Sequence, residues 1–497
     1  MSEAPFEHLH PDDAERIAVS CADCARSDSA ADELTPVDHM PIPVEALAGF
    51  PDGVPQVTRH NRRNFLRNGA VGVAAVYGAS RIDWMRAFEA GVAEGAPANS
   101  QLVMIFLNGG MDGLDVLIPH EAGEYAAYQT ARPGLGRPIG PATGTASGSV
   151  ALAGTGGAFG LATPVLAGAN NNDATGGLDT LWGDGSGGVG SDLALFPAVD
   201  YTPPNLSHFD SRRYWFTGSL ENEQTGWLGR WLDTYGSKEN PLQAVSISGS
   251  VSRQIVTRGA PVAAIRGLGN VGFQLTGASS SQVDPTGEIG TLSGVLAAPA
   301  NDALNRSRTS YGQTVDVARK VAGITQGAAP PGYPANNSLS QRLQTAAALL
   351  GAGIGTRIVT IDWGSFDTHG NQRAALDPQL RVLSAALAAF RDDLTARGIE
   401  QNVLTVVFSE FGRRIKENSS GTDHGAAGLV WVMGSAVRGG MRGDHPGVAK
   451  PDNRGNLQVT TDFRSVYQSL IAEWLGGDPG QILKGSPFPA ISGALLG

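Results

Sequence analysis

Cysteine is nearly absent from this sequence. Among 497 residues the only cysteines are Cys21 and Cys24, so a fold that begins after them cannot rely on disulfide bonds. A single Cys-x-x-Cys pair needs outside ligands, such as His8, His10 or His39, to form a zinc site. We favour the simpler interpretation, in which the pair belongs to a solvated N-terminal tail.

Positive charge is also scarce. The chain has 36 Lys and Arg against 47 Asp and Glu, a net charge of −11, and a pI near 5.3. Proteins that bind nucleic acids need a basic surface, because phosphate binding is driven largely by counterion release. This balance excludes nucleic acid as the expected partner. A charged content of 17% with 67 glycines favours a loop-rich, exported protein over a cytosolic one.

No segment is apolar over the roughly 20 residues that a membrane-spanning helix requires. The run at 68–79 is short and rich in Gly and Ala, and it follows Arg62 and Arg63. Paired arginines before Phe-Leu and a weakly hydrophobic run are typical of a twin-arginine export signal, and residues 96–98 offer a cleavage site. We therefore expect export through the twin-arginine translocase to the periplasm or the cell exterior, with no membrane span in the mature protein. An N-terminal helix that packs on the domain is the alternative.

The composition divides the chain into three parts. Residues 1–58 are acidic and rich in Pro and Ala, which predicts disorder. Residues 59–98 hold the signal region, and residues 99–497 form one large folded domain. Within that domain, residues 134–195 are rich in Gly, Ser, Thr and Asn and are interpreted as inserted surface loops.

Two apolar runs, at 102–107 and 403–408, lack polar alternation, and the stretch 357–361 is interpreted as a further strand between them. Such runs predict strands that are buried on both faces, as in parallel sheets. A helix that begins at Asp377 and Pro378 connects the stretch 357–361 to the run at 403–408. This pattern predicts an α/β fold whose strands deliver their following residues to one edge of the sheet, where open α/β folds bind ligands.

Polar residues of the kinds that ligate metals follow these strands. They are Asp112, Asp367, His369, Glu410, Asp423 and His424. Carboxylates and imidazoles in loops at one sheet edge predict a divalent metal site. Alternatives remain open for each, since Glu410 could pair with Arg413 or Arg414, His369 could pair with Asp367, and residues 423–424 could form a hydrogen-bonded turn.

Ser207 and His208 stand where another helix begins. The Ser207 hydroxyl could simply cap that helix. The same position, at the positive end of a helix dipole, also suits a nucleophile that accepts a phosphoryl or sulfuryl group. Five histidines follow the arginine pair, and four of them lie in Gly- or Asp-bearing loops, as expected of functional rather than core histidines.

Six ordered motifs resemble the family called "domain of unknown function 1501". They are LNGGMDG at 107–113, LSHF at 206–209, TGWLGR at 225–230, FDTHG at 366–370, SEFGR at 409–413 and DHG at 423–425. Members resemble exported bacterial proteins and are grouped with the alkaline phosphatase and sulfatase-like superfamily. The resemblance implies a three-layer α/β/α fold with a mostly parallel central sheet and metal ligands at its carboxyl edge.

Only some of the superfamily's site residues have counterparts in this sequence. Ser207 stands ten residues before a Thr-Gly pair, as the superfamily nucleophile does. Asp367 and His369 match an Asp and a His ligand, although at tighter spacing. The superfamily's next Asp-His pair aligns with Glu410 and Phe411, so one histidine ligand is lost.

Two further positions depart from the superfamily pattern. Asp423 or His424 would replace the lost histidine, and Asp112 is the nearest carboxylate to the first-strand Asp position. The formylglycine signature of sulfatases is missing. A single or altered metal site is therefore expected, with zinc, calcium or magnesium as the ion.

The leading hypothesis is an exported metal-dependent hydrolase of phosphate or sulfate esters, acting on a small-molecule or polymer substrate. Ser207 would attack with His208 beside it, the metal would neutralise the developing charge, and Arg413 would bind ester oxygens. The alternative is a non-catalytic envelope or extracellular scaffold that keeps the fold. A serine esterase is disfavoured, because no G-x-S-x-G elbow occurs.

Overall fold

The computed structural model describes residues 100–141, 147–168, 176–184, 191–268, 317–327, 331–491 and 495–496. The predicted leader, with its cysteine and arginine pairs, lies outside these residues. Within them, no helix has the length and apolar character needed to cross a membrane.

A mostly parallel sheet forms the centre of the domain. Its strands are β1 (Gln101–Leu107), β5 (Leu193–Asp200), β6 (Ala244–Ile247), β7 (Ala263–Ile265), β8 (Ile358–Trp363), β9 (Val403–Ser409), β12 (Gly428–Met433), β13 (Gly440–Met441) and β14 (Thr461–Asp462). The order is β13-β5-β12-β9-β1-β8-β6-β7, and β14 pairs with β5. Only β12 runs antiparallel to its neighbours. The predicted α/β class with a mostly parallel sheet is therefore confirmed.

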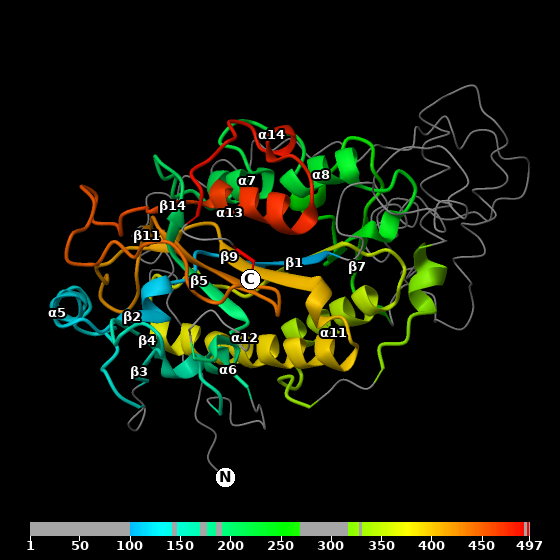
Figure 1. The fold of residues 1–497 in the computed structure, drawn as a ribbon. Helices are drawn as coiled ribbons and strands as arrows, with labels where there is room; N and C mark the ends of the chain where they lie inside the picture. Colours follow the sequence, from blue (N-terminus) through cyan, green and yellow to red (C-terminus); the bar gives the residue numbers. More distant parts are fainter. Residues whose placement is uncertain are drawn as a thin grey trace, which may run out of the picture.

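Helices cover both faces of this sheet, which gives three layers (Figure 1). The helices α6 (Leu178–Trp182), α11 (Ser338–Gly351) and α12 (Gln372–Ala396) lie on one face, and α7 (His208–Thr217), α8 (Trp227–Tyr235) and α13 (Phe463–Ser469) lie on the other. Successive residues of β1 alternate between the two cores: Val103 packs toward α11 and α12, and Met104 toward α7 and α8. Because both faces are covered, the strand is apolar throughout.

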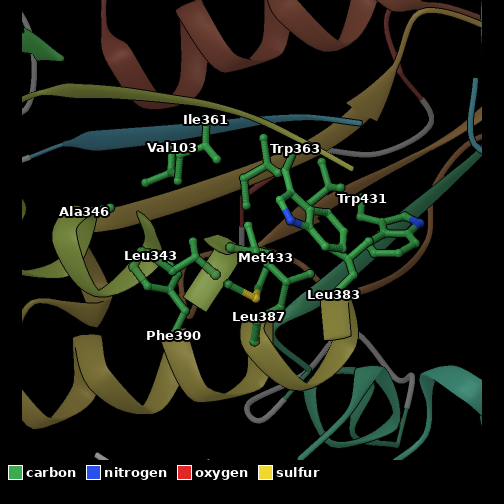
Figure 2. Packing of buried hydrophobic residues seen from close by; sticks show 14 of the residues in the cluster. Val103, Leu343, Ala346, Ile361, Trp363, Leu383, Leu387, Phe390, Trp431 and Met433 are labelled. Atoms are coloured by element: carbon green, nitrogen blue, oxygen red, sulfur yellow. The ribbon is translucent and has the colours of Figure 1, made fainter. Parts of the chain in front are cut away.

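The core between the sheet and α12 is shown in Figure 2. Ile361 and Trp363 of β8 point from the sheet toward Leu383, Leu387 and Phe390 of α12. All five side chains are buried. This packing fixes α12 under the sheet and so fixes the loop that joins β8 to α12.

The start of α12 differs from the prediction. The helix begins at Gln372, and Pro378 lies inside it. Asp377 does not cap the helix, because its carboxylate accepts hydrogen bonds from Arg137 (2.6 Å) and from the Ser147 hydroxyl (2.7 Å). Tertiary contacts of the first turns therefore outweigh the local signal of an Asp-Pro pair.

The segment predicted as inserted loops contains regular structure in its described parts. The strands β3 (Ser149–Ala151) and β4 (Phe159–Ala162) of this segment form a small antiparallel sheet with β2 (Leu117–Pro119), which precedes the segment, and α6 follows β4. Leu181 and Trp182 of α6 pack into the main core. The segment is thus partly integrated into the domain.

Asp200, the last residue of β5, is buried at the same sheet edge as the strand ends described below. Its two carboxylate oxygens accept hydrogen bonds from the backbone N–H groups of Tyr201 and Ala427, both at 2.9 Å. Burial, reinforced by nearby Asp462, raises the pKa of Asp200 to about 7 despite these bonds.

This raised pKa predicts a stability that falls as pH rises. Between about pH 4 and 7 the folded state keeps a proton on Asp200 that the unfolded state has lost, so folding becomes less favourable as pH rises through that window. From pH 5 to pH 8, the free energy of unfolding should fall by about 2–3 kcal/mol relative to Asp200→Asn. Urea unfolding of both proteins at both pH values measures this difference. Parallel pH profiles would contradict it.

Candidate functional site

Four ligand-type side chains meet at the carboxyl edge of the sheet. His208 is the first residue of α7, Asp367 and His369 lie in the loop after β8, and His424 begins β11 (His424–Gly425). We call these four residues the histidine cluster. They come together because β5, β8 and β9, the strands that precede them in the chain, run in the same direction, so the loops that follow these strands open on one edge of the sheet.

The spacing within the histidine cluster matches that of metal ligands. Asp367 Oδ1 lies 3.0 Å from His424 Nε2 and 3.1 Å from His369 Nε2, and these two nitrogens are 3.0 Å apart. Asp367 Oδ2 lies 3.5 Å from His208 Nε2. A tetrahedral ion with bonds of about 2.0–2.1 Å holds its ligand atoms about 3.3 Å apart. The donor atoms of His208, Asp367 and His424 all lie within 4.8 Å of one another.

The second ring nitrogen of each histidine faces a hydrogen-bond acceptor. The Nδ1 atoms of His208, His369 and His424 contact Glu410 Oε1 (2.8 Å), Asp423 Oδ1 (3.2 Å) and the Leu206 carbonyl (3.0 Å), respectively. If a metal were bound, an Nδ1–H that donates to such an acceptor would leave the Nε2 lone pair directed at the ion. Metal-binding histidines are oriented in this way.

His424 is poorly satisfied without a cation. Its ring lies between two acceptors, the Leu206 carbonyl and Asp367 Oδ1, whereas a neutral imidazole has only one N–H. Burial lowers the pKa of His424 and outweighs the hydrogen bond to Asp367. The ring is therefore neutral, and one of its nitrogens faces an acceptor with its lone pair unless a cation lies between them.

His208 has a different protonation state. Burial acts to lower its pKa, but hydrogen bonds to Asp367 and Glu410 raise the pKa to about 9. Without a metal, His208 is therefore a cation between two carboxylates. A metal ion would displace this proton, since ligating imidazoles are neutral.

Glu410 lies behind His208 and does not face the cluster centre. Its buried carboxylate accepts hydrogen bonds from the N–H groups of Gly109 (3.0 Å) and Gly110 (3.1 Å) and from the Ser409 hydroxyl (2.9 Å), in addition to His208. Burial acts to raise the pKa of Glu410, but these bonds, the one from His208 first, hold it below the usual value. The structure thus places this predicted ligand as the residue that orients His208.

Asp423, another predicted ligand, is placed similarly. Its Oδ1 faces His369 Nδ1 and accepts a hydrogen bond from the Asn418 amide at 2.6 Å. Asp423 therefore orients His369. The potential ligand atoms that lie closest together belong to His208, Asp367 and His424, and His369 Nε2 lies beside the last two.

Arg413, which we expected to bind ester oxygens, is fully buried with its donors occupied. Its guanidinium donates to backbone carbonyls and to Asp367 Oδ1 (2.7 Å); the carbonyls are those of Gly109, Gly110 (2.7 Å), Phe366 (3.0 Å) and Thr422 (2.7 Å). Burial acts to raise the pKa of Asp367, but the bonds from the three histidines and the charge of Arg413 hold it well below the usual range. The role of Arg413 is to keep Asp367 ionised and in place.

Asp112, which was predicted as a metal ligand, lies outside the histidine cluster and contacts an arginine. Its carboxylate is buried and forms two hydrogen bonds with Arg132, at 2.8 and 3.0 Å. A carboxylate neutralised in this way has no need of an ion. The loop after β1 instead supplies backbone N–H groups, and it approaches so closely that a Cβ on Gly109 would lie 2.5 Å from the Asp367 nitrogen.

Ser207 occupies the N-cap position of α7 but does not cap it. No side-chain oxygen accepts from the first amides of this helix. The backbone N–H of Ser207 donates to Asn205 Oδ1 at 2.9 Å. Of the two interpretations left open by the sequence, capping is therefore wrong, and the first amides of α7 remain available beside His208.

One side of the histidine cluster is open to solvent. The exposed fraction of the side chain is 34% for Asp367 and 25% for His208, against 4% for His424. Structural zinc sites are closed by four protein ligands, whereas catalytic sites keep a position for water or substrate. The partial exposure is the arrangement expected of a catalytic site.

The part of the chain that holds the histidine cluster matches a known protein family. A search of curated proteins found no match to the chain. The family model described as "Protein of unknown function (DUF1501)" matches residues 200–470, which is more than half of the chain and includes the whole histidine cluster. The chain therefore belongs to the DUF1501 family of proteins of unknown function.

Proposed function

We propose that this protein is an exported, metal-dependent hydrolase of phosphate or sulfate esters. The observation that carries the proposal is the close grouping of potential ligand atoms from His208, Asp367 and His424 at a place that is open to solvent, with His369 Nε2 beside the last two. Calcium and magnesium prefer oxygen ligands, whereas imidazoles suit zinc and other transition metals. The donor set therefore favours a zinc-type ion over the calcium or magnesium also considered from the sequence.

The surroundings of the cluster suit ester cleavage. The Ser207 hydroxyl would attack the phosphorus or sulfur atom, forming a bond to it while the bond to the alcohol oxygen breaks and the alcohol leaves with a proton. The free amides at the start of α7 would bind the negatively charged oxygens. A bound divalent ion would supply positive charge for the attacking oxygen. Water would then cleave the serine ester and regenerate the hydroxyl.

Export through the twin-arginine translocase remains part of the proposal, as does a small-molecule or polymer substrate. Substrates of this translocase cross the membrane folded, which suits a domain that acquires its metal before export. The absence of cysteine after Cys24 agrees with a fold that needs no oxidising compartment.

Elemental analysis of the purified full chain tests the metal centre. We expect about one equivalent of a zinc-type metal in the wild type and none in Asp367→Ala/His424→Ala, because the double variant removes two ligands. His120→Ala is the matched control, since it removes a histidine outside the cluster. Hydrolysis of aryl phosphates or sulfates should disappear with a chelator and return with zinc. If both proteins fold and neither holds metal, the hydrolase proposal fails and the non-catalytic scaffold becomes the better hypothesis.

A further inference from the structure

A buried amide lies beneath the two loops that carry most of the histidine cluster. Gln372 is the first residue of α12 and is 0% exposed. Its Oε1 accepts hydrogen bonds from the hydroxyls of Thr422 (2.6 Å) and Thr368 (3.1 Å). Thr368 stands between Asp367 and His369, and Thr422 is two residues before His424. One oxygen atom therefore joins the two ligand-bearing loops.

Backbone hydrogen bonds also connect the two loops near the Gln372 side chain. The Thr422 N–H donates to the Thr368 carbonyl (3.2 Å), and the Gln372 N–H donates to the Ser420 carbonyl (2.8 Å). Between these bonds, a Cβ on Gly421 would lie 2.2 Å from the His369 carbonyl carbon, so only glycine fits there. The relative position of the two loops is thus fixed both by backbone hydrogen bonds and by the Gln372 side chain.

The opposite end of the amide is anchored by charge. Gln372 Nε2 donates to Asp112 Oδ2 (2.7 Å) and Asp115 Oδ2 (3.2 Å), and Asp112 is paired with buried Arg132. Carboxylates can only accept and threonine hydroxyls here donate, so the orientation of the amide is fully determined. The ion pair thereby fixes Gln372, and Gln372 fixes the loops.

We propose that Gln372, anchored by Asp112, is a positioning residue that sets the affinity of the histidine cluster for a divalent metal. The inference rests on the metal centre proposed above. His369 and His424 come from different loops and must keep their Nε2 atoms about 3 Å apart. Residues that orient ligands in this way typically change metal affinity 10–100-fold when they are replaced.

The first test uses Gln372→Ala in the full chain, with zinc affinity measured by competition against a chromophoric chelator. We expect affinity to fall 10–100-fold and the absorption spectrum of the cobalt-loaded protein to change at saturation, because the ligand geometry relaxes. Gln379→Ala is the matched control. Gln379 lies in the same helix and forms hydrogen bonds with the backbone of Ser365 in the same loop, but it has no hydrogen bond with Thr368 or Thr422. The zinc affinity of Gln379→Ala should therefore stay within about threefold of wild type.

A charge-conserving exchange provides the second test. In Gln372→Glu a carboxylate faces Asp112, so affinity should fall at least tenfold. In Asp112→Asn/Gln372→Glu the new carboxylate can accept from both threonines and from the new amide, but it still faces Asp115, whose Oδ2 lies 3.2 Å from Gln372 Nε2, so only part of the lost affinity should return. Normal zinc affinity in Gln372→Ala or in Gln372→Glu would overturn the inference while leaving the hydrolase proposal intact. A wild type that binds no metal would overturn both.

Discussion

Replacing Arg413 with lysine is expected to lower the free energy of unfolding by about 3–5 kcal/mol. The guanidinium donates to four backbone carbonyls and to Asp367 from a position with 0% side-chain exposure. A lysine ammonium has three donors on one nitrogen and cannot reproduce this planar arrangement. Buried carbonyls and the Asp367 carboxylate would lose their partners, and each unpaired group costs about 1–3 kcal/mol.

Urea unfolding of the metal-free proteins measures this effect, with Arg414→Lys as the matched control. Arg414 is the next residue and is only partly buried, and its side chain bonds the Arg454 carbonyl. Its replacement should change stability by no more than about 0.5 kcal/mol. Equal free energies of unfolding for the two variants would show that the hydrogen bonds of Arg413 do not stabilise the fold as expected.

Ser207→Ala is expected to reduce kcat for ester hydrolysis by at least about 1,000-fold, as the loss of a nucleophile does in other hydrolases. Metal content should remain unchanged, because Ser207 does not orient any histidine of the cluster. Ser219→Ala, just beyond the opposite end of α7, is the matched control and should keep wild-type kcat. Steady-state kinetics of metal-loaded proteins provide the measurement.

A normal kcat in Ser207→Ala would contradict the role of this residue as the nucleophile. If hydrolysis still required the metal, the attacking group would be a water at the open side of the cluster. If hydrolysis persisted without metal, the catalytic centre would lie elsewhere.

The layered fold could be predicted from the sequence because a strand that is covered by helices on both faces of the sheet has a continuous run of apolar residues. The runs that became β1 and β9 were identified for this reason. Asp367 and His369 follow from the same logic, because the end of a parallel strand locates the next few residues. His424 lies much further from the end of β9, so this logic places it only on the same edge of the sheet. The start of α12 could not be predicted, since the contacts of Asp377 with Arg137 and Ser147 are visible only in the folded chain.

The partners of the carboxylates at the site could not be predicted from the sequence, for one physical reason. Whether a carboxylate meets a metal, an arginine or an imidazole depends on tertiary distances that local sequence does not encode. Asp112 meets Arg132, and Glu410 meets His208. Gln372 was not identified because a neutral amide has no spacing signal. His208, predicted as a catalytic residue, lies with Asp367 and His424 in one group of potential ligands.

The position of β1 has a consequence for how the protein is made. This strand opens the described domain, yet its hydrogen-bonding neighbours, β8 and β9, come from the C-terminal part of the chain. During synthesis β1 therefore cannot pair with its neighbouring strands until most of the protein has left the ribosome. Until then its apolar side chains and its backbone hydrogen-bonding groups lack partners, which favours aggregation. Truncation before β9 should yield aggregates rather than a smaller folded domain.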